Sequence, residues 1–282
     1  VSNVYAAGSS MNATNAYVPG YWKDGVWTAL APIDATKSSM VYSIAISGSN
    51  VYAAGYSNNA TNVMVPGYWK DGIWTALPPI DATKSSMVSS IAISGSNVYA
   101  AGWSLNATNV MVPGYWKDGV WTALTPINAA AHSMVYSLAI SGSSVYAAGF
   151  SSTMNAKVSG YWKDGVWTAL PSIDAAKDSE GTSIVISGAN VYVAGYSMNA
   201  SEVMVPGYWE DGVWTALTSI DATKSSMVSS IAISSSNVYV AGSSTNASDV
   251  RVPGYWEDGV WTALTPIDAT MDNEVLCIAV SQ

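Results

Sequence analysis

The stretch Gly67-Tyr68-Trp69-Lys70-Asp71-Gly72-Ile73-Trp74-Thr75-Ala76-Leu77 indicates how the chain folds, because closely matching copies of it recur along the whole chain. Two short aromatic and β-branched runs flank Asp71-Gly72, a dipeptide suited to a type I′ turn whose central residues need a positive φ. The stretch therefore predicts a β-hairpin. Six copies account for nearly the whole chain, 47 residues apart except for one interval of 46, and they begin at Gly20, Gly67, Gly114, Gly160, Gly207 and Gly254.

The composition fits a folded repeat protein. Of the 282 residues, 49% are hydrophobic and only 10% are charged, which is enough apolar surface for a large core and argues against disorder. A repeat period of this size outweighs chain length as a guide to domain number. We therefore expect one domain over residues 1–282.

The charge balance and the length of the apolar runs exclude two classes of partner. The net charge is −9 and Arg251 is the single arginine, whereas binding to a phosphate backbone needs clustered Lys and Arg. The apolar runs are shorter than the roughly 18 to 20 residues that a spanning helix requires. We expect neither nucleic-acid binding nor membrane insertion.

Each repeat is predicted to form four short strands, which in the second repeat cover residues 43–47, 51–55, 68–69 and 74–77. These strands lack strict alternation of polar and apolar residues, so both faces of each small sheet are expected to be buried against neighbours. Radially stacked blades bury both faces in this way. The sequence therefore predicts an all-β fold, a six-bladed β-propeller with four-stranded blades.

The two ends of the chain complement each other. Residues 275–281 have the pattern of a first strand with no second strand after it, and residues 2–8 that of a second strand with no first before it. Together they would complete one blade and remove two exposed sheet edges. We expect the ring to close by pairing of the C-terminal strand with the N-terminal blade.

The stretch Ser43-Ile44-Ala45-Ile46-Ser47-Gly48-Ser49-Asn50-Val51-Tyr52-Ala53-Ala54-Gly55 resembles the inner hairpin of six-bladed propellers of the NHL and YWTD-like type. The Tyr-Trp-Lys-Asp-Gly-Val-Trp hairpin resembles uncharacterised secreted repeat propellers of microbes. The resemblance covers the whole chain and implies the fold. It does not imply a function, because propellers host many different functions. Where NHL-like repeats often end the second strand with an acidic residue, this chain has Gly8, Gly55, Gly102, Gly149, Gly195 and Gly242.

The long loops between second and third strands carry a repeated Asn-Ala-Thr or Asn-Ala-Ser pattern. It is an N-glycosylation acceptor pattern, and an Asn at this place also suits loop turn chemistry. The fourth repeat lacks it, since Asn155-Ala156-Lys157 breaks the pattern and the loop is one residue shorter. We expect glycosylation at Asn12, Asn59, Asn106, Asn199 and Asn246.

The crossings from one repeat to the next carry a second repeated polar residue, expected near the mouth of the central channel. Converging carboxylates could hold a hard cation. The favoured interpretation is an Asp-capped turn whose charge is partly offset by a nearby Lys, so no bound metal or cofactor is predicted. The residues are Asp34, Asp81, Asn128, Asp174, Asp221 and Asp268.

Twelve of the thirteen Trp residues are the repeated hairpin pairs, which we expect to pack between blades rather than to stack on sugars. Trp103 is the one outside the pairs and is expected to be a surface contact. Trp103 and the aromatic residues at the same repeat position are the predicted ligand or partner contacts. They are Trp103, Tyr56, Phe150 and Tyr196.

Catalysis has little support, because a hydrolase needs a nucleophile with a base, or two carboxylates in contrasting environments. His132 is the only histidine, and the single Cys277 is interpreted as a strand residue. An enzyme would regain support if the individual acidic residues of the fourth and last crossings met in one pocket, namely Asp178, Glu180, Asp272 and Glu274.

These observations favour a non-catalytic structural or adhesive module that is extracellular or at the cell surface and N-glycosylated on its long-loop face. Its low charge suits packing against protein neighbours or self-assembly. The alternative is a carbohydrate-binding lectin with up to six equivalent weak sites that gains affinity by multivalency.

Overall fold

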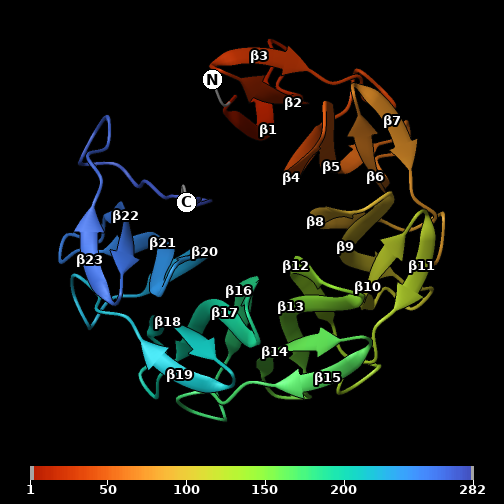
Figure 1. Ribbon diagram of the computed structural model, residues 1–282. Helices are drawn as coiled ribbons and strands as arrows, with labels where there is room; N and C mark the ends of the chain where they lie inside the picture. The colour runs from red at the N-terminus through yellow and green to blue at the C-terminus, as the bar shows by residue number, and fades with distance from the viewer. Residues whose placement is uncertain (1–2, 281–282) are drawn as a thin grey trace. The chain divides into compact units, whose positions relative to one another are not determined.

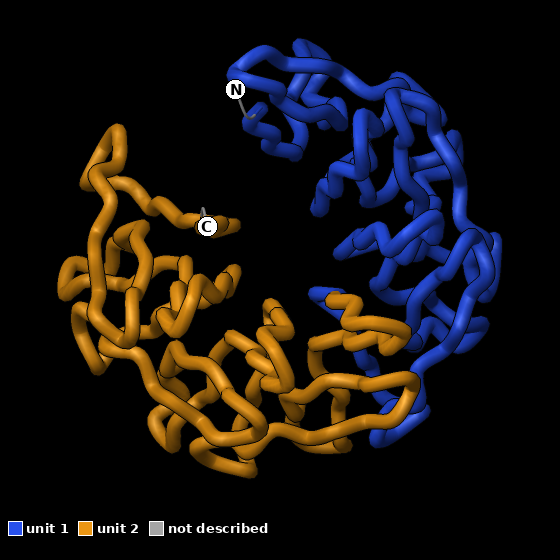
Figure 2. Tube along the Cα trace, in the orientation of Figure 1, with its two compact units in different colours: residues 1–138 blue, residues 139–282 orange. Residues whose placement is uncertain are grey.

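The computed structural model describes residues 3–280 and divides into two compact units, residues 1–138 and 139–282 (Figure 2). Each unit is described by itself, and the single domain over residues 1–282 stays a prediction. Every regular element assigned in residues 3–280 is a β-strand, as predicted. No helix in this part of the chain is long and apolar enough to cross a membrane.

The strands of the first unit form three antiparallel sheets, with orders β1-β2-β3, β4-β5-β6-β7 and β11-β10-β9-β8 (Figure 1). We name these sheets blades 1 to 3. The strands are β1 (Tyr5–Met11), β2 (Tyr17–Lys23), β3 (Val26–Ala29), β4 (Ser39–Ser47), β5 (Asn50–Asn58), β6 (Met64–Lys70), β7 (Ile73–Ala76), β8 (Ser86–Ser94), β9 (Asn97–Leu105), β10 (Met111–Lys117) and β11 (Val120–Ala123).

The second unit holds blades 5 and 6 and most of blade 4, whose first strand crosses the boundary between the units. Each of the three is a four-stranded sheet in chain order. The strands are β12 (Ser133–Ser141), β13 (Ser144–Ser152), β14 (Lys157–Lys163), β15 (Val166–Ala169), β16 (Ser179–Ser187), β17 (Asn190–Met198), β18 (Met204–Glu210), β19 (Val213–Ala216), β20 (Ser226–Ser234), β21 (Asn237–Thr245), β22 (Arg251–Glu257) and β23 (Val260–Ala263). The chain is an all-β propeller with six blades, as the sequence predicts.

The hairpin turn has the predicted type I′ geometry. Asp71 has a φ of 50° and Gly72 a φ of 85°, and every blade repeats this pair of positive values. The turn is also tied to the second strand, because the Val51 amide donates to Asp71 Oδ1 over 2.8 Å and Asp71 N donates to the Val51 carbonyl over 2.9 Å. Asp71 therefore shapes the turn and links three strands of the blade.

Gly55, the predicted end of the second strand, lies inside β5 and opposite a β-bulge. Val41 pairs with Gly55 and Ser43 pairs with Ala54, so Tyr42 is the extra residue of the bulge. A Cβ on Gly55 would overlap the carbonyl oxygen of Met40. The position therefore excludes the acidic side chain that NHL-like repeats often carry there.

The Trp pairs of the hairpins pack as core, as predicted. Trp69 is fully buried and its ring centroid lies 4.3 Å from that of Trp74. Trp69 Nε1 also donates to the carbonyl of Ala31 in the crossing from the preceding blade, over 2.7 Å. Trp116, Trp209 and Trp256 make the same bond. In these four hairpins the inner Trp thus joins a blade to the crossing before it.

The C-terminal segment differs from its predicted structure. The sequence predicts a strand over residues 275–281, but none is assigned in residues 264–280, and residue 281 lies outside the described part. A strand requires a ladder of hydrogen bonds, whereas within the described residues 275–280 the backbone bond to another segment is that from Val275 N to Gly242 O, over 3.4 Å. Blade 1 has three strands. Ring closure, which would involve both units, stays a prediction.

Candidate functional site

The Asn of the long loops organises the loop backbone. Asn59 Oδ1 accepts hydrogen bonds from Thr61 N, Thr61 Oγ1 and Val63 N over 2.8 to 3.0 Å. The other four Asn-Ala-Thr or Asn-Ala-Ser loops repeat the two backbone bonds. Loop turn chemistry is therefore confirmed, and glycosylation at these five Asn residues stays a prediction.

The loop of blade 4 uses a different residue for the same task. Thr153 holds the place of the loop Asn, and its Oγ1 accepts from Asn155 N over 3.2 Å and from Ala156 N over 3.0 Å. Asn155 is thus not the counterpart of the other loop Asn residues. The hydroxyl stabilises a loop that is one residue shorter than the others.

The Asp residues of the crossings form local turns. Asp81 Oδ1 accepts from Thr83 N over 2.9 Å and from Thr83 Oγ1 over 2.7 Å, and Lys84 N donates to the Asp81 carbonyl over 3.0 Å. The Thr83 hydrogen bonds, with a smaller contribution from Lys84, lower the pKa of Asp81. No group of three or more His, Cys, Asp or Glu side chains suited to a metal occurs within residues 3–280. The hydrogen bonds confirm the capped turn, and the absence of a bound metal stays a prediction.

The four predicted aromatic contacts lie inside the blades. Trp103 is 7% exposed, Tyr56 9%, Phe150 2% and Tyr196 8%. These positions face the bulged start of the first strand, as the pairing of Tyr56 with Met40 shows. The surface position expected of Trp103 is therefore wrong, whereas a contact role for the four residues remains a prediction.

A repeated polar contact joins each third strand to the crossing that follows it. The backbone amide of the first residue of the third strand donates to the side chain 21 residues later. In the blade 2 to blade 3 seam, Met64 N donates to Ser85 Oγ over 3.2 Å. At the blade 3 to blade 4 seam, His132 takes the place of Ser, because Met111 N donates to His132 Nδ1 over 3.0 Å. We use "seam" for this junction between a third strand and the crossing segment that follows it.

Two seams carry charged side chains in this arrangement. At the blade 4 to blade 5 seam, Lys157 N donates to Asp178 Oδ1 over 2.8 Å and Lys157 Nζ donates to Glu180 Oε1 over 2.6 Å. Glu180 is buried, and Lys157 Nζ lies 4.8 Å from the ring centroid of Phe150. Burial, followed by the nearby Glu180 carboxylate, raises the pKa of Tyr196.

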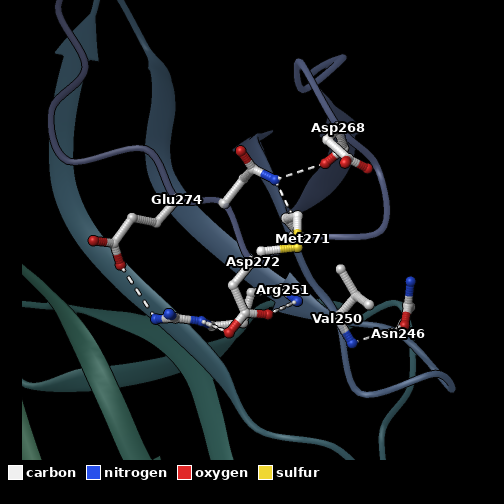
Figure 3. A network of polar contacts seen from close by, with 8 residues as sticks. Asn246, Val250, Arg251, Asp268, Met271, Asp272 and Glu274 are labelled. Carbon is white, nitrogen blue, oxygen red and sulfur yellow. Dashed lines mark hydrogen bonds and ion pairs between the residues drawn. The ribbon is translucent and has the colours of Figure 1, made fainter.

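The equivalent seam after blade 6 is shown in Figure 3. Arg251 N donates to Asp272 Oδ1 over 2.9 Å, Arg251 Nε to Asp272 Oδ2 over 3.2 Å, and Arg251 Nη1 to Glu274 Oε2 over 3.4 Å. Asp178 and Glu180 therefore occupy one seam and Asp272 and Glu274 another, so the four carboxylates do not share a pocket. The sequence signal for both seams is a basic residue followed 21 and 23 positions later by acidic ones.

A pocket of about 410 Å³ lies at the blade 4 to blade 5 seam. It lies beside the short loop of blade 4, between the crossing and the end of β17. Its lining combines an amide, an ammonium group, two carboxylates and a thioether, from Asn155, Ala176, Lys177, Asp178, Met198 and Glu202. The short loop and the individual crossing are both visible in the sequence, whereas their meeting in one pocket is visible only in the structure.

The charges of the pocket are only partly paired. Lys177 Nζ lies 2.8 Å from Glu202 Oε1, and this bond raises the pKa of Lys177 and lowers that of Glu202. Lys157 Nζ is engaged by Glu180. No Lys, Arg or His nitrogen within residues 3–280 makes an ion pair with Asp178. One carboxylate of the pocket thus lacks a cation.

No protein-family model and no curated protein matches the chain. Among solved structures it is similar to YCF48 bound to a D1 peptide, with 14% identity, a TM-score of 0.51, and coverage of 88% of this chain and 74% of that one. It is also similar to Aleuria aurantia lectin, described as a six-bladed β-propeller with a fucose recognition mode, with 13% identity, a TM-score of 0.47 and coverage of 93% and 90%. An exo-1,5-α-L-arabinanase from a bovine ruminal metagenomic library matches with 11% identity, a TM-score of 0.43 and coverage of 83% and 100%. At these identities the likenesses concern the fold alone.

Proposed function

We propose that the chain is a carbohydrate-binding propeller module whose ligand occupies the blade 4 to blade 5 pocket. The observation that carries this proposal is the lining of that pocket. Its volume of about 410 Å³ lies within the roughly 300 to 1,000 Å³ of small-molecule sites. Asn155, Asp178 and Glu202 offer planar oxygen and nitrogen groups for hydroxyls, and Met198 offers an apolar surface for the carbon skeleton of a sugar ring.

The proposed site is specific to one seam. In three other seams the place of Asp178 is held by Ser38, Ser85 and Ser225, which accept the same backbone bond through a hydroxyl. Those seams also lack the short loop of blade 4. The proposal is therefore a non-equivalent binding site rather than six equivalent ones, and avidity would come from assembly of several chains.

A glycan array probed with the intact chain tests the proposal, and competition by free sugar separates binding from nonspecific retention. Met198→Trp should fill the pocket and abolish saturable binding. The matched control is Thr245→Trp, because Thr245 ends β21 as Met198 ends β17. Absence of binding to any array member, or equal binding by Met198→Trp, would contradict the proposal.

The second candidate function is a glycosylated structural or adhesive module, extracellular or at the cell surface. It is favoured by the five long-loop Asn residues, which are partly exposed and whose Nδ2 atoms make no bond to protein in the described part of the chain. In three loops the Thr hydroxyl of the acceptor pattern bonds to the Asn side chain.

Intact mass of the protein from its native source tests this candidate. Glycosylation predicts a mass above 29.4 kDa, with the excess on peptides that contain the five Asn residues. The peptide that contains Asn155 is an internal control, because Lys157 replaces the hydroxyl residue of the pattern. A mass equal to that of the bare chain would exclude glycosylation.

A further inference from the structure

We propose that Asp178 anchors a protonated amino group of the ligand, so that the pocket takes amino sugars in preference to their N-acetylated and neutral counterparts. This inference rests on the proposed carbohydrate-binding function and names the class of sugar. It follows from the distribution of charge in the pocket and from a comparison with the equivalent seam of blade 6.

The pocket carries one negative charge more than its ion pairs neutralise. Lys177 and Glu202 pair with each other over 2.8 Å, and Lys157 and Glu180 pair over 2.6 Å. The carboxylate of Asp178 remains without an ion-pair partner among the described residues. Its Oδ1 accepts the backbone amide of Lys157, so Oδ2 is the atom left for a ligand. A ligand ammonium group would supply the missing cation and a charge-assisted hydrogen bond.

The blade 6 seam shows what a neutralised version of this position looks like. Asp272 accepts the Arg251 backbone amide through Oδ1, just as Asp178 accepts that of Lys157, but its Oδ2 is occupied by Arg251 Nε over 3.2 Å. The hydrogen bond from the Arg251 backbone amide lowers the pKa of Asp272, and the Arg251 guanidinium lowers it further. The Lys157 ammonium group is directed instead to Glu180. The two seams therefore differ in whether the chain itself supplies the cation.

The orientation of Asp178 is fixed by the backbone on both sides. Its side chain is held by Lys157 N over 2.8 Å, and its carbonyl accepts from Met198 N over 2.9 Å. Lys157 is in turn held by the Glu180 carboxylate, which is buried. An anchor that is positioned before the ligand arrives loses little entropy on binding.

The blade repeat supplies a substitution that removes the charge and keeps the fold. In Asp178→Ser, the hydroxyl takes the place that Ser85 and Ser225 have in other seams, where each accepts the equivalent backbone amide. Asp178→Asn is a second variant that keeps the shape of the carboxylate. Asp272→Ser is the matched control, because it makes the same change at a seam outside the pocket.

The experiment titrates the intact chain by calorimetry with glucosamine, galactosamine and mannosamine, each beside its N-acetyl derivative and the parent hexose, at slightly acidic pH. At least one amine should bind about 10- to 100-fold more tightly than its two counterparts, as expected for a hydrogen bond to a charged group. Asp178→Ser and Asp178→Asn should abolish that preference, and Asp272→Ser should retain it. Thermal melting checks that each variant is folded.

Three results would overturn the inference. They are equal affinity for amine, N-acetyl and neutral forms, absence of binding by all three amines, and a preference that survives in both Asp178 variants. The glycan array distinguishes this failure from failure of the proposed function. Pocket-dependent binding of neutral or acidic glycans would reject the amino-sugar assignment alone, whereas an array without any binding would reject both.

Discussion

At the scale of single residues, the two Trp side chains of the hairpin at residues 67–77 have different roles although they belong to one repeated motif. Trp69 is fully buried, and its Nε1 donates to the Ala31 carbonyl. Trp74 is half-buried, and its Nε1 is buried without an acceptor among the described residues. An unpaired buried donor is destabilising, so the same substitution should have different effects at the two positions.

We expect Trp69→Phe to lower the free energy of unfolding by about 2 to 4 kcal/mol, because it leaves the Ala31 carbonyl unpaired and opens a cavity. Trp74→Phe should change it by less than ~1 kcal/mol, because the lost ring contact is offset by removal of an unpaired donor. Urea denaturation of the two variants measures the difference. Equal destabilisation would show that Trp74 Nε1 has a partner.

Sequence analysis could predict the inner Trp as core because the residue repeats in every hairpin. The surface position predicted for Trp103 is wrong, because a residue outside the repeated pairs can also be buried. The burial of Trp103 is set by the bulged strand opposite it, where Met87 is its partner. Bulges depend on the pairing of two strands, and nothing in the spacing of either strand alone indicates them.

At the scale of the element, the hairpin turn depends on Asp71. Its φ of 50° is a conformation that Asn and Asp tolerate better than Ala does. Its carboxylate accepts the Val51 amide, which ties the turn to the second strand. Local conformation and a contact to another strand therefore depend on the same side chain.

We expect Asp71→Ala to cost about 1 to 2 kcal/mol, because the substitution strains the turn and leaves the Val51 amide without its side-chain acceptor. Asp71→Asn is the control, since its side-chain oxygen can accept the same bond and Asn tolerates a positive φ. Hydrogen exchange at the Val51 amide should be faster in Asp71→Ala and nearly unchanged in Asp71→Asn. Unchanged exchange in both variants would contradict the role given to the carboxylate.

The turn can be predicted from the sequence, because an Asp-Gly dipeptide between two short strands favours few turn types. The pocket cannot be predicted in this way. The pocket requires the short loop that Thr153 closes, the carboxylate of Asp178 and the end of β17 to meet. These parts come from two blades. The short loop and the individual crossing are each visible in the sequence, but the distance between them depends on how the two blades pack.

At the scale of the whole molecule, the predicted closure of the ring concerns blade 1, whose sheet has three strands. In blade 2 the first strand lies so close to the second that a Cβ on Gly55 would overlap the Met40 carbonyl. Gly8 holds the same repeat position in blade 1, and there a Cβ would lie 3.6 Å from Trp22 Cζ3, an ordinary contact. Glu274 and Met40 occupy the same position of the sequence repeat. A closing strand would therefore place Glu274 in blade 1 where blade 2 has Met40.

The substitution of Ala at these two glycines therefore tests closure. Gly55→Ala should destabilise the protein by about 1 to 3 kcal/mol, because the added methyl group forces the first strand away from the second. If the C-terminal strand pairs with blade 1, Gly8→Ala should be destabilising to a similar degree, since the carbonyl of Glu274 would meet the new Cβ. If blade 1 keeps three strands, Gly8→Ala should stay within about 0.5 kcal/mol of the unsubstituted chain, as a surface substitution does. Denaturant midpoints of the two variants measured side by side decide between a closed and an open first blade.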